Sequence, residues 1–381
     1  MANEVLALDQ STEWANTVLT KIDQKMQAVN QRNWDKIPYI VDHGQYVDMA
    51  QKSIYWWTNG FFAGSLWQLQ QATGNETYAQ NAQKIEAHLK RALSGFTGLH
   101  HDVGFMYLHT AVADYRLTQR KESRISGLHA ANLLAGRFNV NGQFIRSWNT
   151  PESMGWAIVD SLMNLPLLYW ATNETGDPRF QEIAIRHADR LLECLVRADG
   201  SVGHIAAFDP ATGAFQGIVA GQGFDEKSAW ARGQAWALYG YALSYRHTQQ
   251  ERYLTAAKNI AAFVIPKLQE EDYLSLVDYR APYPNGKKYD ASAGVCIACG
   301  LLELANWVTT AKAEAYQNAA VRILQATVDQ WCDWDTQADG IVRMSSQSYH
   351  QQAETHVKLV YADYFFIEGI LRLLGKDFMI W

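Results

Sequence analysis

Charged residues are scarce in this chain of 381 residues, where they make up 19% of the sequence and leave a net charge of -6 at pH 7. An acidic chain without a basic excess is a poor partner for nucleic acid or for an anionic membrane, so we expect neither. A small anionic ligand is still compatible, because a site can be locally basic. Asp, Asn, Pro or Gly interrupt the apolar stretches, which fall short of the roughly 20 residues that a membrane-spanning helix needs.

Cysteine is also scarce, with four scattered residues: Cys194, Cys296, Cys299 and Cys332. The one C-x-x-C, in "VCIAC", lies in a run of small apolar residues that is typical of a helix. A redox or zinc site would need a loop, a second pair of ligands or a βαβ unit, so we expect reduced, buried cysteines and no metal. No motif requires a cofactor. The first residues, "MANEVLALDQSTEW", lack the basic and apolar regions of a signal peptide. We therefore expect a cytoplasmic protein.

Linkers are missing too, since no Pro/Gly/Ser-rich stretch, charge block or low-complexity segment divides the chain. We expect one domain over residues 1–381. A weak repeat runs along it: an apolar helix, a short polar turn, an aromatic residue and a second helix. The five copies are 66–89, 112–134, 167–192, 241–264 and 302–324. Two more helices are predicted around 12–28 and 361–374.

The predicted helices fall into two classes. Some are apolar nearly all round, as a buried inner helix should be, and the others are amphipathic, as an outer layer should be. The inner class holds 160–172, 230–246 and 292–307, and the outer class holds 78–92, 178–195 and 313–331. Alternating layers describe a solenoid or a closed ring. About six hairpins complete a ring, and neither end resembles a polar cap, so we predict an all-α (α/α)6 barrel, a toroid of six helical hairpins.

Long non-helical stretches are expected on one face of this ring, where a site should lie. They are 137–153, 197–227, 269–291 and 333–358. They contain short strand-like pieces, so we expect short β-hairpins in the loops on the face of the site. In "GHIAAFDPATGAFQGIV", for example, the turn signal "DPATG" separates two apolar strands. Aromatic residues are abundant, with 14 Trp, 19 Tyr and 14 Phe, and many cluster where segments meet. Besides packing, aromatic faces at such places suit sugar rings.

Asp160 stands in the middle of an otherwise apolar stretch, "MGWAIVDSLMNLPLLYW". An unpaired carboxylate there costs several kcal/mol, or its pKa rises instead. It could be a satisfied buried residue or the cap of a helix that enters at Ser161. Pro166 could kink that helix or mark its first turn with Asn164 as the cap. The remaining interpretation is a catalytic acid.

Asp102 precedes an apolar helix in "LHHDVGFMYLHTAV". It could be the N-cap of that helix or a second acid of the site. A metal site made by His100, His101 and Asp102 is less favoured, because adjacent histidines rarely converge on one ion and no partner motif is present.

A polar cluster in "EKSAWARGQAWALYGYAL" stands at the entrance to an inner helix: Trp230, Arg232, Gln234 and Trp236. A buried Arg232 needs an anion, which is either a structural salt bridge or a substrate carboxylate. His204, with Gln222, lies in the hairpin loop and could be a surface residue. Together with the two acids, these residues fall on one face. Two acids in one cavity raise the pKa of one of them, which is the outline of glycoside chemistry.

Six segments resemble those of the unsaturated glucuronyl hydrolases, glycoside hydrolase family 88. They are "WTNGFFAGSLW", "HHDVGF", "VDSLMNLPLLYWA", "WARGQAW", "SAGVCIACGLLELA" and "DYFFIEGILRL". They occur in the right order over nearly the whole chain. The family fold is an (α/α)6 barrel, in agreement with the repeats. The rhamnogalacturonyl hydrolases of family 105 share that fold and chemistry.

The resemblance implies removal of a Δ4,5-unsaturated uronic acid from lyase-made glycosaminoglycan fragments, by hydration of the vinyl-ether double bond. It implies that Asp160 is the general acid/base and that Asp102 is a second carboxylate, which holds sugar hydroxyls and helps to keep Asp160 protonated. Residues at substrate-contact positions of the family are Trp57, His101, Trp148, His204, Gln222, Trp230, Arg232 and Trp236.

Three departures from the family pattern put the aglycone and its sulfation in doubt. Asn59 replaces the usual Asp, "LVYADY" replaces "IWGDY", and "MSSQSYHQQAETHVK" does not clearly reproduce a sulfate-reading Ser/Lys pattern. Three other functions stay open: an unsaturated rhamnogalacturonyl hydrolase, an inverting hydrolase of a saturated glycan, and a sugar-binding toroid without catalysis.

Overall fold

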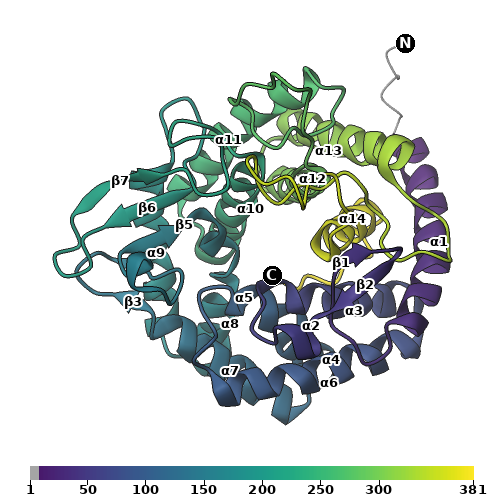
Figure 1. Ribbon diagram of the computed structural model, residues 1–381, viewed down its shortest axis with the longest axis horizontal. Helices are drawn as coiled ribbons and strands as arrows, with labels where there is room; N and C mark the ends of the chain where they lie inside the picture. The colour runs from purple at the N-terminus through teal and green to yellow at the C-terminus, as the bar shows by residue number, and fades with distance from the viewer. Residues whose placement is uncertain (1–7) are drawn as a thin grey trace.

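The chain folds into a closed ring of inner and outer helices in the computed structural model, which describes residues 8–381 (Figure 1). The inner helices are α3 (Phe61–Thr73), α5 (Val103–Tyr107) continued by the π-helix η2 (Leu108–Val112) and α6 (Ala113–Thr118), α8 (Pro166–Thr175), α10 (Ala231–Thr248), α12 (Ala291–Ala305) and α14 (Val360–Leu373). The outer helices are α1 (Leu8–Arg32), α4 (Glu76–Gly95), α7 (Lys121–Ala135), α9 (Arg179–Leu195), α11 (Glu251–Gln269) and α13 (Thr310–Trp331). Helix α14 contacts both α3 and α1, which closes the ring.

The predicted hairpins and the barrel are confirmed, and the turns follow ordinary helix chemistry. Helix α3 ends at Gly74, whose φ of 74° is the left-handed C-cap that glycine adopts at little cost. Asn75 then caps α4 by accepting the Thr77 backbone N–H. Residues 1–7, the first half of "MANEVLALDQSTEW", lie outside the described residues, and with them a part of the expectation about a signal peptide.

One predicted inner helix begins later than expected. The range 160–172 was predicted as helix, but α8 starts at Pro166. Residues Val159–Met163 form a 3-10 helix, η4, instead. Pro166 occupies the first turn, where a missing N–H costs nothing, so it starts α8 rather than kinking a longer helix.

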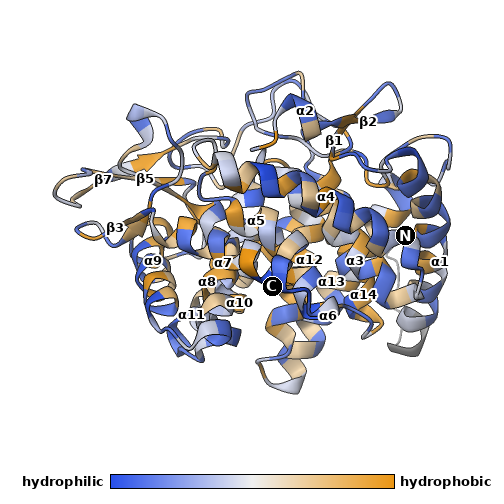
Figure 2. Cartoon of the chain, turned by 90° about the horizontal axis from the view of Figure 1, so that it is seen from below, coloured by the Kyte–Doolittle hydropathy of each residue, from blue (hydrophilic) through white to orange (hydrophobic). Residues whose placement is uncertain are grey.

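Short strands gather on one side of the ring, as Figure 2 shows. Strands β6 (Ile205–Phe208) and β7 (Phe215–Val219) form the predicted hairpin. A third strand, β5 (Trp156–Ile158), pairs antiparallel with β6. It was not predicted, and neither was the pair β1 (Pro38–Asp42) with β2 (Gln45–Asp48), whereas β3 (Phe138–Asn139) with β4 (Phe144–Ile145) lies in the stretch 137–153, where short strands were expected. Helix α2 (Met49–Lys52) and the 3-10 helices η1 (Trp57–Gly60) and η3 (Pro151–Ser153) are short connectors.

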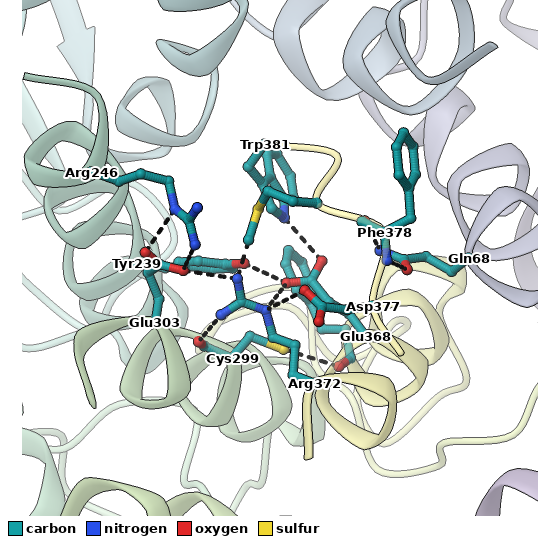
Figure 3. A network of polar contacts seen from close by, with 12 residues as sticks. Gln68, Tyr239, Arg246, Cys299, Glu303, Glu368, Arg372, Asp377, Phe378 and Trp381 are labelled. Carbon is teal, nitrogen blue, oxygen red and sulfur yellow. Dashed lines mark hydrogen bonds and ion pairs between the residues drawn. The ribbon is translucent and has the colours of Figure 1, made fainter. Parts of the chain in front are cut away.

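The centre of the ring is filled by aromatic side chains. Trp381 is buried, and its indole N–H donates to Glu368 (2.9 Å), within the network of Figure 3. Its ring lies parallel to that of Phe365, with centroids 6.0 Å apart, and meets Phe105 edge-on at 6.1 Å. Phe105 in turn contacts Trp236, with centroids 5.2 Å apart. An aromatic column thus runs from the segment around Trp381 to the tryptophans of the predicted site.

The cysteines are free, and Cys296 and Cys299 are fully buried in α12, as expected for packing residues. Burial raises the pKa of both thiols well above the usual range. Cys194 and Cys332 are only partly buried. Among residues 8–381, none of the helices combines the length and the apolar character that a membrane crossing requires.

One buried acid in the outer layer predicts a pH-dependent stability. Glu86 of α4 is 2% exposed, and its carboxylate accepts a hydrogen bond from Ser123 (2.8 Å) close to Asp114. Burial, reinforced by the Asp114 charge, raises the pKa of Glu86 to about 7. Because the folded protein holds the Glu86 proton more tightly than the unfolded chain does, protonation of Glu86 stabilises the fold at low pH. This contribution is complete below the pKa of Glu86 in the unfolded chain and is lost as the pH rises to about 7.

We expect Glu86→Gln to remove this pH dependence and to raise the free energy of unfolding at pH 8 by about 3 kcal/mol, from 1.36 kcal/mol per pKa unit. Urea unfolding at pH 5 and pH 8 measures it. The control is Glu76→Gln in the exposed first turn of the same helix, which should leave the pH dependence intact. An unchanged slope in Glu86→Gln would contradict the prediction.

Candidate active site

Asp160 lies in η4, directly after strand β5. The β5–β6 register pairs Ile158 with Ile205, and the Val159 N–H donates to the His204 carbonyl (3.0 Å). The sheet therefore brings the His204 ring beside Asp160, with Nε2 3.6 Å from Oδ2. This is an ion-pair distance and is too long for a hydrogen bond. The Asp160 side chain is 13% exposed, so the acid at the end of an apolar strand remains accessible.

Asp102 occupies the N-cap position of α5, as one interpretation expected, but its side chain makes no capping hydrogen bond, so capping does not account for the carboxyl. Asn164 ties the two acidic segments together. Its Nδ2 lies 3.3 Å from Asp102 Oδ1 and 3.3 Å from the Asp160 carbonyl, while its Oδ1 accepts the Phe105 N–H (2.7 Å). Gly104 permits this approach, since a Cβ there would lie 2.5 Å from the Asn164 backbone.

Asp102 is the acid whose ionisation the surroundings oppose. Burial, and then the nearby Asp160 charge, raise its pKa well above the usual range. Two histidines face the carboxyl: His101 Nε2 lies 3.2 Å from Oδ1, and His100 Nδ1 lies 3.4 Å from Oδ2. Burial lowers the pKa of His101 well below its usual value and that of His100 to about 4. The sequence predicted a raised pKa for Asp160, but the acid whose pKa burial raises is Asp102, which lies between two imidazoles.

His204 is not a surface residue, because its side chain is only 3% exposed. Its Nδ1 accepts the backbone N–H of Gln222 (2.9 Å). The carbonyl oxygen of Ala220 also lies 3.2 Å from Nδ1, and the shorter of the two contacts, with the Gln222 N–H, places the proton of a neutral ring on Nε2, beside Asp160. The Gln222 side chain does not face the acids but donates to the carbonyl of Gln347 (2.7 Å). Gln222 thus fixes the tautomer of His204 and binds the loop after α13.

The four tryptophans differ in their exposure. Trp230 is 2% exposed and lies over the His204 ring, with centroids 4.4 Å apart. Trp236 is fully buried and meets Trp57 edge-on at 6.5 Å. Trp57 and Trp148 are half-buried. The indole N–H groups of Trp230 and Trp236 have no acceptor among the described residues, so they are donors without a protein partner.

Arg232 is held by the protein itself. Its side chain is 1% exposed and forms an ion pair with Asp290. The guanidinium also donates to the carbonyls of Ser346 (2.8 Å) and Gln347 (2.6 Å) and lies 4.6 Å from the Trp230 ring centroid. Of the two interpretations of Arg232, the structural salt bridge is the one that describes these contacts.

Two departures from the family pattern have local explanations. Asn59 is buried, and its Nδ2 donates to the carbonyls of Ser53 and Ile54, both at 3.0 Å, which an aspartate could not do. Asp363, in the segment that departs from the family pattern before the last helix, accepts hydrogen bonds from the Tyr46 hydroxyl (2.6 Å) and the Val342 N–H (2.8 Å). It therefore holds β2 against the loop that follows α13.

The residue that the sequence analysis did not assign to the site is Asn164, which it considered only as a helix cap. Its contacts are with three residues, Asp102 and Phe105 of one segment and Asp160 of its own, and a single Asn in an apolar run does not reveal them. The four-residue spacing from Asp160 was the one signal present.

Comparisons with known proteins agree with this geometry. The family model of Glycosyl Hydrolase Family 88 matches residues 26–366. An unsaturated glucuronyl hydrolase of Bacillus sp. (strain GL1) is 33% identical, over 89% of this chain and 91% of that protein. An unsaturated chondroitin disaccharide hydrolase of Streptococcus pyogenes serotype M1 is 30% identical, over 83% of this chain and 80% of that protein.

Among solved structures, an Asp-to-Asn variant of UGL with dGlcA-Glc-Rha-Glc has a TM-score of 0.88. It is 31% identical in sequence, and the match covers 94% of this chain and 96% of that one. A family model that spans most of the chain, together with relatives above 30% identity, decides the assignment. The chain belongs to glycosyl hydrolase family 88 and is a glycoside hydrolase.

Proposed function

We propose that the enzyme removes the Δ4,5-unsaturated uronic acid from the non-reducing end of lyase-generated glycosaminoglycan oligosaccharides. The relatives are hydrolases named for unsaturated glucuronyl and unsaturated chondroitin substrates, and the solved complex holds a saccharide that begins with dGlcA. The observation that carries the proposal is the acid pair, in which Asn164 bonds both to the Asp102 carboxyl and to the Asp160 backbone.

The chemistry needs one carboxyl that gives and takes a proton. Asp160 donates its proton to C4 while the C4=C5 π electrons form the new C–H bond. A water oxygen then bonds to C5 and its proton passes to Asp160, which ends the step protonated as it began. The hemiketal at C5 opens, and the open-chain hemiacetal at C1 releases the aglycone as an alcohol. One water is consumed, and C1 need not be attacked directly.

Donors around Asp160 suit an anionic sugar. His204 Nε2 and the indole N–H groups of Trp230 and Trp236 lack protein acceptors among the described residues, and buried donors without partners are costly unless a ligand satisfies them. Trp57 and Trp148 offer half-buried aromatic faces for the ring. Asp102 would hold sugar hydroxyls, and His101 lies beside it.

In this proposal Arg232 and Gln222 act on the substrate indirectly, through a loop. Both bind the carbonyl of Gln347, Arg232 through its guanidinium and Gln222 through its amide. We therefore assign them to the placement of the loop that follows α13.

The test is a panel of unsaturated disaccharides of chondroitin, hyaluronan, heparin and rhamnogalacturonan types, sulfated and unsulfated, with saturated oligosaccharides beside them. We expect the ultraviolet absorbance of the conjugated double bond to fall with one or more of the glycosaminoglycan types. Turnover of rhamnogalacturonan products alone would assign the enzyme to the other substrate class. Turnover of saturated glycans alone, or tight binding without turnover, would overturn the proposal.

We further propose that the ring is one catalytic domain and that the enzyme works in the cytoplasm. The closure of α14 against α3 and α1 supports the first proposal, and four free cysteines support the second. Cell fractionation tests the location.

A further inference from the structure

The tautomer of His101 is determined by its contact with Ser147. The ring Nδ1 lies 3.0 Å from the Ser147 carbonyl oxygen, which can only accept a hydrogen bond. Nδ1 therefore carries the ring proton. The same carbonyl also accepts the His101 backbone N–H (3.2 Å) and a guanidinium N–H of Arg137 (2.9 Å), so it is the acceptor at the centre of a donor cluster.

With the proton on Nδ1, the Nε2 of a neutral His101 is an unprotonated nitrogen that lies 3.2 Å from Asp102 Oδ1 and has no hydrogen-bond partner among the described residues. A lone pair and a carboxylate oxygen repel each other at that distance, whereas a carboxylic acid O–H would donate to the ring. The ring is 1% exposed, and the positive or potentially positive groups around it, His100, Arg137 and His187, oppose an imidazolium. A proton between Asp102 and His101 therefore belongs to the carboxyl.

The orientation of the Asp102 carboxyl is fixed from the other side by Asn164. Because Asn164 Oδ1 accepts the Phe105 N–H, its Nδ2 is the atom that faces Asp102 Oδ1. His100 is held at Oδ2, where its Nδ1 also lies 3.5 Å from the Asp102 backbone nitrogen. The groups that face Asp102 are thus His100 and His101 from its own segment, Asp160 and Asn164 from the segment between β5 and α8, and Arg137 from the segment after α7.

We propose that Asp102 is a neutral carboxylic acid that donates its proton to His101 Nε2 and keeps it throughout turnover. His101 is then a positioning residue that acts through Asp102, and not a substrate contact. Asp160 is the one carboxyl of the pair that exchanges a proton with the substrate. This last statement rests on the proposed function, whereas the protonation of Asp102 does not.

Infrared difference spectroscopy of the free enzyme tests the protonation directly. We expect the wild type at neutral pH to show the carbonyl stretch of a protonated carboxyl that Asp102→Asn lacks. Nitrogen-15 NMR of labelled histidine should show His101 protonated on Nδ1 only. A carboxylate at Asp102, an imidazolium at His101, or a Zn²⁺ ion bound stoichiometrically by His100, His101 and Asp102 would overturn the proposal. These readouts need no substrate, so they stand even if the proposed reaction is wrong.

Kinetics of His101→Leu separate positioning from substrate contact. Leucine has no acceptor in place of Nε2, so Asp102 should ionise more easily, and the alkaline limb of the kcat/KM profile should move about one pH unit lower, as loss of a hydrogen bond to an ionisable group does. KM at the optimum should change less than twofold. The matched variant is His100→Leu, because the His100 ring lies 3.4 Å from Oδ2 and its loss should shift the limb less. A higher KM with an unmoved limb would make His101 a substrate contact.

Discussion

Asp160→Asn is expected to lower kcat on an unsaturated disaccharide by about 1000-fold, within the range that a general acid/base contributes. The amide can neither protonate C4 nor accept the proton of water. Asp160 Oδ2 has no hydrogen-bond partner among the described residues, so the variant loses no hydrogen bond of that oxygen and should unfold within about 1 kcal/mol of the wild type. KM should change little, because His204 and the tryptophan donors remain. Loss of ultraviolet absorbance and thermal unfolding measure the two effects.

The control for this variant is Asp42→Asn, because Asp42 is an aspartate of β1 whose side chain is 68% exposed. It should keep full activity. If Asp160→Asn retained the wild-type rate, neither the proposed acid nor the proposed reaction would hold. Circular dichroism shows whether the Asp160→Asn variant is folded. A folded variant that binds the disaccharide without turning it over has lost the chemistry, whereas an unfolded variant has lost the site.

The ring could be predicted because its information is local. Each hairpin can be predicted from three features of its own segment: helical periodicity, a turn such as Gly74 with Asn75, and the pairing of an apolar helix with an amphipathic one. Strand β5 could not be predicted in the same way. It has three residues, and its pairing with β6 depends on a segment almost 50 residues further along the chain. Periodicity carries no signal at that length.

The site was predicted in its residues but not in its contacts. Asp102, Asp160 and His204 stand out as polar residues in apolar surroundings, which composition alone can reveal. The role of Asn164 depends on contacts with a segment about 60 positions earlier in the chain, at Asp102 and Phe105, and the raised pKa of Asp102 depends on how deeply the fold buries it. The partner of Arg232 could not be predicted for the same reason. The anion that a buried arginine needs could be a substrate or an acidic residue, and the residue that provides it, Asp290, lies 58 positions away in the sequence.

Asp290→Asn is expected to lower the free energy of unfolding by about 3 kcal/mol, because it leaves the Arg232 guanidinium buried without its anion. Asparagine caps helices about as well as aspartate, so the cap of α12, in which Asp290 accepts the Ser292 N–H, should survive. The loss therefore reports the ion pair. Urea unfolding measures it. The control is Asp189→Asn, whose partner Arg252 is 44% exposed and which should cost less than about 1 kcal/mol.

The two interpretations of Arg232 predict opposite results for Arg232→Met. If the guanidinium pairs with Asp290 and binds the loop at Ser346 and Gln347, Arg232→Met should lower the free energy of unfolding. Adding Asp290→Asn should then recover a part of that free energy, because no unpaired buried charge is left. If it reads a substrate carboxylate, KM should rise at least tenfold while the free energy of unfolding stays within about 1 kcal/mol, since a site that hydrogen-bonds its ligand loses most when that bond is removed. The contacts favour the first outcome, and a double-variant cycle with the KM of each member decides between them.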